Sequence, residues 1–307
     1  MPLWDFNKIP GLADLQKEVR EKLYLIAPVP SGEISELALK FGKLAHEDAT
    51  ASLFLRGKGL YRPATFHLQQ SVEKSAKGFG LLVSILRPED LQQGVGHFSP
   101  IALTYDLGNF LNKINIFYNE FVNINFEHLI EKHSFPMTCF LDIQKSLKTI
   151  LAKVKPLDQK EYERSNSELR MPETKARMWK STLELDRSNP LVSQALHSLE
   201  NNVTKSGKSK MVRLLFKFAV GDSNLAKFYY ETFSEAGSRI YYLSMLTAWH
   251  EKEPRYPPIK PADHWDPEAY TASSQFVQYQ KRLIEEAKRT ADAIVRAADA
   301  IRTHSDN

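Results

Sequence analysis

The stretch Leu60–Leu86, LYRPATFHLQQSVEKSAKGFGLLVSIL, carries the clearest helical pattern in this sequence of 307 residues. Pro63 suits the first turn of a helix, where a backbone N–H would lack an intrahelical acceptor in any case. Pro88 follows the stretch and predicts that the helix has ended before it. Between these prolines, apolar side chains recur at steps of three and four residues, which places them on one face: Val72, Ala76, Phe79, Val83 and Leu86. The stretch therefore predicts one long amphipathic helix.

The same periodicity extends over most of the chain. Glycine is scarce, at 13 of 307 residues, and the alternating Val, Ile and Thr runs typical of strands are rare. We expect loops and one short helix over 156–190, where prolines and charges of both signs interrupt the pattern. Helices are expected at 11–27, 34–57, 60–86, 99–125, 140–153, 190–203, 208–220, 222–250 and 267–302. We therefore predict an all-α protein, an up-and-down bundle of long antiparallel helices with an additional helical insertion.

Composition limits the classes of function. Lysine and arginine total 41 against 37 for aspartate and glutamate, so net charge alone does not predict nucleic-acid binding. The single cysteine, Cys139, excludes a disulfide within the chain and a cysteine-rich zinc site. No stretch is as long and apolar as a membrane span, and the N-terminus lacks the pattern of a secretory signal. We expect a cytoplasmic protein without a membrane partner or a cofactor.

Two stretches resemble known motifs, but the sequence lacks other residues that those motifs need. Gly207-Lys208-Ser209 matches the end of a P-loop, but Asn202 stands where that motif needs a glycine. His128 and Glu131 lie one helical turn apart, like half of a metal-binding helix. A di-metal bundle needs matching Glu-x-x-His pairs on other helices, and the sequence contains no such set. We therefore predict neither a P-loop nor a metal site.

A basic block spans 204–219 and contains no acidic residue. Its cations would attract a phosphate backbone through counterion release. The exposed start of an ordinary surface helix can have the same composition, so phosphate binding and a purely structural role both stay open. The cations are Lys205, Lys208, Lys210, Arg213 and Lys217.

The segment Phe66–Gly78, FHLQQSVEKSAKG, resembles the second helix of the HEPN superfamily. These are helical bundles named for their occurrence in higher eukaryotes and prokaryotes and for nucleotide binding. The shared pattern is an aromatic residue, two glutamines, a Glu-Lys pair and a second lysine three residues on: Phe66, Gln69, Gln70, Glu73, Lys74 and Lys77. Arg255-Tyr256-Pro257 is similar to the Arg-Tyr-Pro that often precedes the last HEPN helix. Gly96-His97 lies where many members carry Thr-His.

The resemblance implies a domain organisation. Residues 1–35 would form an N-terminal helix and linker, and residues 36–100 and 245–303 a HEPN-like bundle. The intervening segment is longer than the family needs, so 101–244 is expected to be a helical insertion or extension packed on that bundle. Segments 66–78 and 255–302 should then lie side by side.

Many HEPN relatives are metal-independent ribonucleases that use an arginine followed four to six residues later by a histidine. There the histidine acts on the 2′-hydroxyl proton or the leaving group, and the arginine holds the phosphate. This chain matches that spacing at Arg62 and His67, on a different helix from the family's motif. His97 is a second candidate base, with a helix-cap role as the alternative. An Arg and a His from distant segments, such as Arg239, His250 and Arg255, are a further possibility.

Three hypotheses follow. The first is a HEPN-like module that binds a nucleotide, RNA or a protein partner such as an antitoxin, in a prokaryotic toxin or defence system. Its expected binding residues are Lys74, Lys77, Lys205, Lys208, Lys210, Arg213, Arg255 and Tyr256. The second is a metal-independent endoribonuclease that uses Arg62 and His67, or His97. The third is a non-catalytic helical scaffold. Since family members often pair through helix faces, the resemblance also implies a homodimer.

Overall fold

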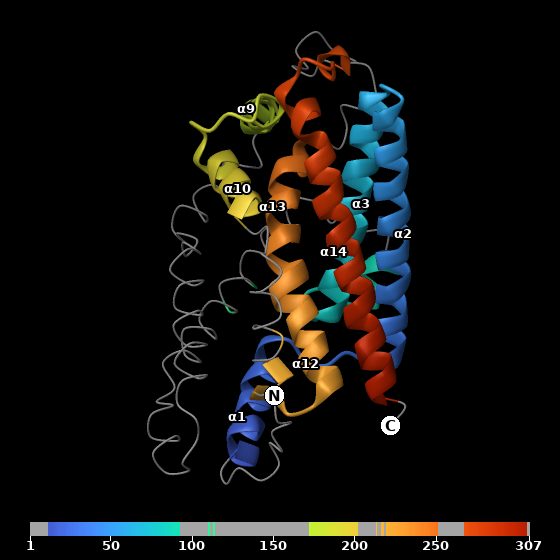
Figure 1. Ribbon diagram of the computed structural model, residues 1–307, viewed down its shortest axis with the longest axis vertical. Helices are drawn as coiled ribbons and strands as arrows, with labels where there is room; N and C mark the ends of the chain where they lie inside the picture. Colours follow the sequence, from blue (N-terminus) through green and yellow to red (C-terminus); the bar gives the residue numbers. More distant parts are fainter. Residues whose placement is uncertain are drawn as a thin grey trace, which may run out of the picture.

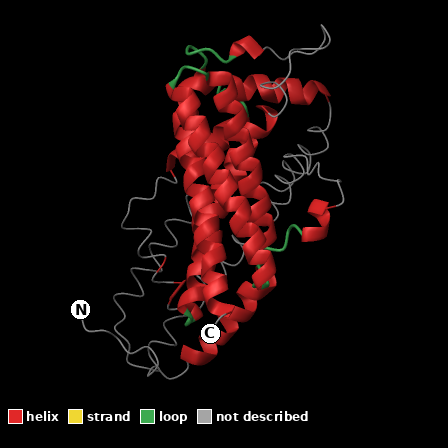
Figure 2. Ribbon diagram, turned by 90° about the vertical axis from the view of Figure 1, so that its right-hand side faces the viewer, coloured by secondary structure: helices red, strands yellow, loops and turns green. Residues whose placement is uncertain are grey.

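The computed structural model describes residues 12–92, 172–201, 219–250 and 267–305, together with residues 110, 113, 213, 216 and 217. Every regular element in these ranges is a helix, which confirms the all-α prediction. The helical segments 32–57, 61–82, 223–250 and 275–305 run alongside one another (Figure 1), and a second view shows the same bundle from the side (Figure 2). Within this part of the chain, no helix is long and apolar enough to cross a membrane.

The helices are α1 (Leu12–Ile26), α2 (Gly32–Gly57), α3 (Tyr61–Leu82), α4 (Pro88–Gln92), α9 (Pro172–Leu183), α10 (Pro190–Asn201), α12 (Ser223–Tyr229), the π-helix η2 (Tyr230–Gly237), α13 (Ser238–Thr247), the 3₁₀ turns η3 (Ala248–His250) and η4 (Pro267–Ala269), and α14 (Gln275–Ser305).

Helices α2 and α3 form an antiparallel hairpin. Ser31 caps α2, because its side chain accepts the backbone N–H of Ile34 at 3.4 Å. Gly59 follows the helix with φ +75°, a left-handed conformation that glycine adopts without steric cost. Helix α2 thus ends at the expected residue 57 and begins at Gly32, two residues before the expected start.

Helix α3 ends at Leu82, before the predicted end at Leu86. The chain folds back over the helix end, where the N–H groups of Ile85 and Leu86 both donate to the carbonyl of Gly80, at 2.8 and 3.0 Å. A Cβ on Gly80 would lie 2.9 Å from Cγ of Leu86, so this return requires glycine. Leu86 is buried as its spacing predicted, although it lies outside the helix.

The helix predicted over 222–250 changes type along its length. Asp222 caps α12 by accepting the N–H groups of Asn224 and Leu225, both at 2.8 Å. The chain then continues through the π-helix η2 into α13 and η3. A π-helical segment hydrogen-bonds to the fifth residue instead of the fourth, is rare, and is found disproportionately at functional sites.

The last helix begins later than the expected residue 267. The Ser274 side chain accepts the N–H of Val277 at 3.3 Å and thereby caps α14. Helix α14 packs against α2 and α3 and also against α12 and η2. The segment 66–78 and the described part of the last helical segment therefore lie in one bundle, as predicted.

Helix α13 crosses residue 244, where the predicted insertion was expected to end. It contacts both α3 and α14, and α12 and η2 contact α14 as well. Residues 223–247 therefore form part of the bundle itself.

Two glycines allow the helices of this bundle to approach closely. A Cβ on Gly42 of α2 would lie 2.9 Å from Cγ2 of Val295, and a Cβ on Gly78 of α3 would lie 3.2 Å from both Ile294 Cγ2 and the carbonyl oxygen of Ala38. The small residues of α14 are fully buried within the same chain: Ala287, Ala291 and Ala298. They serve close packing inside the bundle, so the homodimer remains a prediction without a surface assigned to it.

The close approach at Gly78 predicts a specific loss of stability. Gly78→Leu should lower the free energy of unfolding by about 2 kcal/mol or more, because the added side chain meets a backbone carbonyl that cannot move away. Urea unfolding followed by circular dichroism measures this change.

Gly57→Leu is the matched control, since a Cβ at Gly57 meets nothing within 4 Å. Equal effects of the two substitutions would contradict the proposed packing.

Candidate functional site

Three polar side chains that the bundle brings together lie on the outer edge of the α2–α3 hairpin. His67 and Lys74 are seven residues apart on α3, and therefore on the same helix face. Both bind Asp48 of α2: His67 Nδ1 lies 2.8 Å from one carboxylate oxygen, and Lys74 Nζ contacts the other. The Asp48 side chain is only 12% exposed, against 32% for His67 and 29% for Lys74. A nearly buried carboxylate thus holds two partly exposed groups.

The hydrogen bond to Asp48 sets the chemistry of His67. An ionised carboxylate only accepts, so Nδ1 must carry a proton and Nε2 is the nitrogen with the lone pair in the neutral ring. A histidine oriented in this way can remove a proton from a hydroxyl group. The neighbouring Lys74 ammonium has three donors and can pair with an anion. The arrangement is therefore suited to binding a phosphate ester and to proton transfer beside it.

The residues that carry the HEPN resemblance form a second cluster, around Glu73. Its carboxylate accepts Gln69 Nε2 at 3.1 Å and Lys77 Nζ at 2.7 Å, and Gln70 bonds to Gln69 Oε1 at 2.7 Å. Gln69 is fully buried and its amide needs these partners. The pattern Gln-Gln…Glu-Lys…Lys is thus explained locally in this chain, and Glu73 and Lys77 form the ion pair that their spacing of four residues allows.

A further histidine–aspartate pair lies on the other side of α2. His46 Nδ1 is 2.7 Å from Oδ1 of Asp292 on α14. Helix α2 is thus joined by one such pair to α3 and by another to α14.

The remaining predicted site residues are dispersed. Arg62 lies half-buried in the first turn of α3, while His67 takes Asp48 as its hydrogen-bond partner. Arg239 and His250 bind separate sets of partners and do not share a site. His97, Lys205, Lys208, Lys210, Arg255 and Tyr256 lie outside the described residues.

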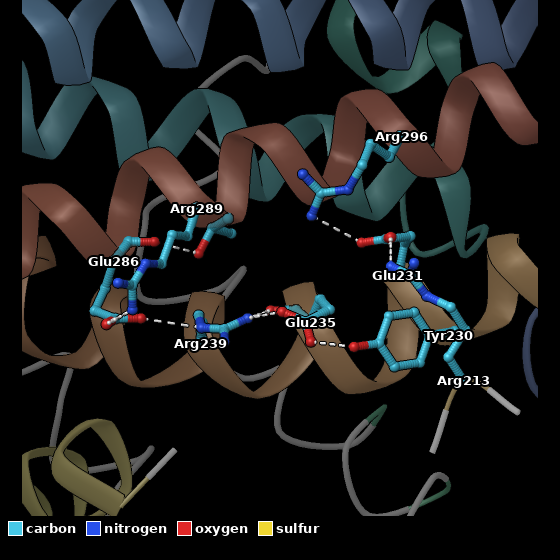
Figure 3. Close-up of polar contacts among 9 residues, drawn as sticks. Arg213, Tyr230, Glu231, Glu235, Arg239, Glu286, Arg289 and Arg296 are labelled. Carbon is cyan, nitrogen blue, oxygen red and sulfur yellow. Dashed lines mark hydrogen bonds and ion pairs between the residues drawn. The ribbon is translucent and has the colours of Figure 1, made fainter. Parts of the chain in front are cut away.

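A network of arginines and glutamates fills the contact between η2–α13 and α14 (Figure 3). Glu231 is fully buried and binds Arg213 at 3.2 Å and Arg296 at 2.9 Å. Arg239, also buried, binds Glu235 at 2.8 Å and Glu286 at 3.0 Å. The network also includes Tyr230, whose hydroxyl donates to Glu235, and Arg289, which lies 2.9 Å from Glu286.

Ion pairing offsets the effect of burial at two members of this network, Glu235 and Arg296. Burial by itself would raise the pKa of the Glu235 carboxyl, but Arg239 and the hydrogen bond from Tyr230 lower it below its ordinary value. Burial acts against the charge of Arg296 too, yet its bond with Glu231 holds its pKa above the usual value. Both groups are therefore charged at neutral pH.

Sequence reasoning missed most of this network, although one signal was present. Glu231, Glu235 and Arg239 stand at steps of four within FYYETFSEAGSRIYYLSML, which is otherwise rich in aromatic residues. Charges at core positions of a buried helix need partners. The spacing does not say which residues of α14 supply them.

His250, which the sequence suggested as a distant catalytic base, is the last residue of η3 and is completely buried. It contacts Thr182 of α9 and Phe276 of α14. Trp179 Nε1 donates to the Tyr270 hydroxyl at 3.2 Å, and that hydroxyl donates to His250 Nδ1 at 2.7 Å. Thr182 donates its hydroxyl proton to the Trp179 carbonyl at 2.9 Å, so it must accept from His250 Nε2 at 3.0 Å. The closed chain requires a neutral imidazole with the proton on Nε2.

Comparison with protein-family models, with curated proteins and with solved structures finds no match. The HEPN resemblance therefore rests on the residues quoted for it.

The burial of His250 predicts an acid-sensitive fold. Burial lowers the pKa of His250 to about 3, from an ordinary value near 6.5. As the pH falls, His250 is protonated in the unfolded chain before it is protonated in the folded chain. The neutral His250 therefore stabilises the fold fully above its unfolded pKa of about 6.5, and this stabilisation is lost as the pH falls toward 3. Between pH 8 and pH 5, the free energy of unfolding should fall by about 2 kcal/mol from this group.

Urea unfolding at pH 8 and at pH 5 measures the change in the free energy of unfolding. This change should be smaller in His250→Gln than in wild type by about 2 kcal/mol. His197→Gln, at an exposed histidine, is the control and should retain the wild-type change. An unchanged pH dependence in His250→Gln would contradict the buried neutral histidine.

Proposed function

We propose that the chain is a HEPN-like binding protein that recognises the phosphate backbone of RNA, or a nucleotide, at the edge of the α2–α3 hairpin. The observation that carries this proposal is the convergence of His67 and Lys74 on Asp48. Both residues belong to, or lie next to, the pattern on which the HEPN resemblance depends. A role in a prokaryotic toxin or defence system, with an antitoxin or another protein as partner, is part of the same proposal.

The charge balance of this edge favours recognition by oriented hydrogen bonds. Lys74 and Lys77 are matched by Asp48 and Glu73, so His67 decides whether the edge carries an excess positive charge. Non-specific attraction to a polyanion is therefore weak. A bound phosphate would instead meet a lysine and a histidine already held in place, which lowers the entropic cost of binding.

This proposal predicts which lysine matters. Lys74→Ala should weaken binding of single-stranded RNA about tenfold and reduce the salt dependence by about one phosphate contact. Filter binding at several salt concentrations, in the presence of a chelator, measures both quantities. The matched control is Lys180→Ala, at an exposed lysine that also faces a glutamate one turn away.

Saturable RNA binding that Lys74→Ala leaves unchanged would contradict the proposed site. If the wild-type protein binds no RNA, the result would contradict the binding proposal and favour the non-catalytic scaffold.

A second candidate function, metal-independent RNA cleavage, is favoured by the hydrogen bond between Asp48 and His67. His67 Nε2 would take the 2′-hydroxyl proton as the 2′-oxygen bonds to phosphorus, while Lys74 would stabilise charge on the phosphate. The bond from phosphorus to the 5′-oxygen would break, and that oxygen would take a proton from water, which leaves a 2′,3′-cyclic phosphate and a 5′-hydroxyl end. This assignment uses His67, as the Arg62–His67 hypothesis did, but with Asp48 and Lys74 as its neighbours.

Cleavage by this route should occur with a chelator present and should spare DNA, which lacks the 2′-hydroxyl. His67→Ala should reduce the cleavage rate at least about 100-fold, the ordinary contribution of general acid–base catalysis. Gel analysis of end-labelled RNA measures the rate, with His197→Ala as a control for loss of an exposed histidine. Cleavage that persists in His67→Ala, or that also degrades DNA, would contradict this function.

A further inference from the structure

Glu231 holds two arginines at one surface point of the bundle. Each oxygen of its carboxylate binds a different guanidinium, that of Arg213 at 3.2 Å and that of Arg296 at 2.9 Å. The glutamate is completely buried, whereas the side chains of Arg213 and Arg296 are 59% and 43% exposed. Figure 3 shows both arginines directed at this carboxylate, from opposite directions, and the exposed fractions show that water reaches the arginines and does not reach the glutamate.

Each guanidinium is held by contacts of its own. That of Arg213 lies 4.9 Å from the centre of the Tyr230 ring, at cation–π distance, and that of Arg296 is bound by Glu231. The contact with Glu231 uses one terminal nitrogen of each arginine, and a guanidinium has five N–H donors in all. Each arginine therefore has N–H donors beyond the one that binds Glu231, and both sets lie beside the same carboxylate.

Stability alone does not account for this arrangement. A buried ion pair contributes little net stability compared with apolar residues of the same size. The glutamate also sits on a π-helix, an element found disproportionately at functional sites. An arginine pair oriented by a buried carboxylate has a clear use, which is bidentate binding of a phosphate group.

The surrounding charges fit an anionic ligand. Arg213, Arg239, Arg289 and Arg296 meet three glutamates, which leaves one positive charge in excess in the network. Asp292, the acidic neighbour of Arg296 on α14, offsets part of this charge, and its carboxylate is hydrogen-bonded to His46 of α2. Arg289 is 55% exposed and lies two helical turns before Arg296, on the same face of α14.

We propose that Arg213 and Arg296, oriented by Glu231, form a binding site for a terminal phosphate or diphosphate group. The site combines Arg213 with Glu231 of η2 and Arg296 of α14, and it shares no residue with the α2–α3 edge. Its ligand is a free phosphate compound or the 5′-phosphate end of a nucleic acid, since both present the same dianionic group.

Isothermal titration of the full chain with inorganic pyrophosphate tests this site. Arg213→Lys and Arg296→Lys each keep the charge opposite Glu231 but remove the guanidinium fork, and each should weaken binding about tenfold. Arg302→Lys is the matched control, because Arg302 lies on the same helix, is 46% exposed and pairs with Glu36. Circular dichroism confirms that the variants are folded.

A second arm compares a 5′-phosphorylated oligonucleotide with its 5′-hydroxyl form, and a preference that Arg296→Lys removes would assign the ligand to a nucleic-acid end. The absence of saturable pyrophosphate binding, or an equal loss in Arg302→Lys, would overturn the proposal. Lys74→Ala should bind pyrophosphate as wild type does. Loss in Lys74→Ala without loss in the arginine variants would place the phosphate at the α2–α3 edge and overturn this site alone.

Discussion

The close contact of α14 with the α2–α3 hairpin is the constraint on which the other features depend. Gly42 and Gly78 leave no room for a side chain where Ile294 and Val295 approach. Because the helices meet at this short distance, polar groups at the edges of α2 lie within hydrogen-bond reach of both neighbours. Asp48 reaches His67 of α3, and His46 reaches Asp292 of α14. Packing of small residues in the centre thus determines which charges meet at the periphery.

The contact of α14 with η2 and α13 is organised by ion pairs, whereas its contact with α2 and α3 is organised by small residues. Glu231, Glu286 and Arg239 are removed from water, and each is compensated by a partner on the facing element. Removing one member of such a set leaves an uncompensated buried charge, which is far costlier than replacing the whole set by apolar residues. The network therefore fixes the rotation of η2–α13 relative to α14. It also carries the arginines to the surface in fixed positions.

The sequence predicts local features well and the contacts between helices poorly. Ser31, Gly59 and Asp222 each mark a helix end through a local backbone requirement, and the Glu73–Lys77 pair follows from one helical turn. The bond between Asp48 and His67 depends on how two helices are rotated, which spacing within either helix does not contain. The sequence does not predict the π-helix for another reason, which is that the residues of η2 fit an α-helical pattern equally well. Leu86 shows that an apolar period predicts burial even where the helix has already ended.

The hydrogen bond from His67 to Asp48 determines which imidazole nitrogen of His67 carries the proton, and this tautomer can be measured. Long-range ¹H–¹⁵N correlation spectra of histidine-labelled protein, at a pH where the ring is neutral, distinguish protonation at Nδ1 from protonation at Nε2. The spectra of His67→Gln identify the signal. We expect the proton on Nδ1 of His67 and on Nε2 of His250, two opposite tautomers in one protein. A His67 ring protonated at Nε2 would rule out the hydrogen bond to Asp48, because Asp48 would then have no proton to accept from it.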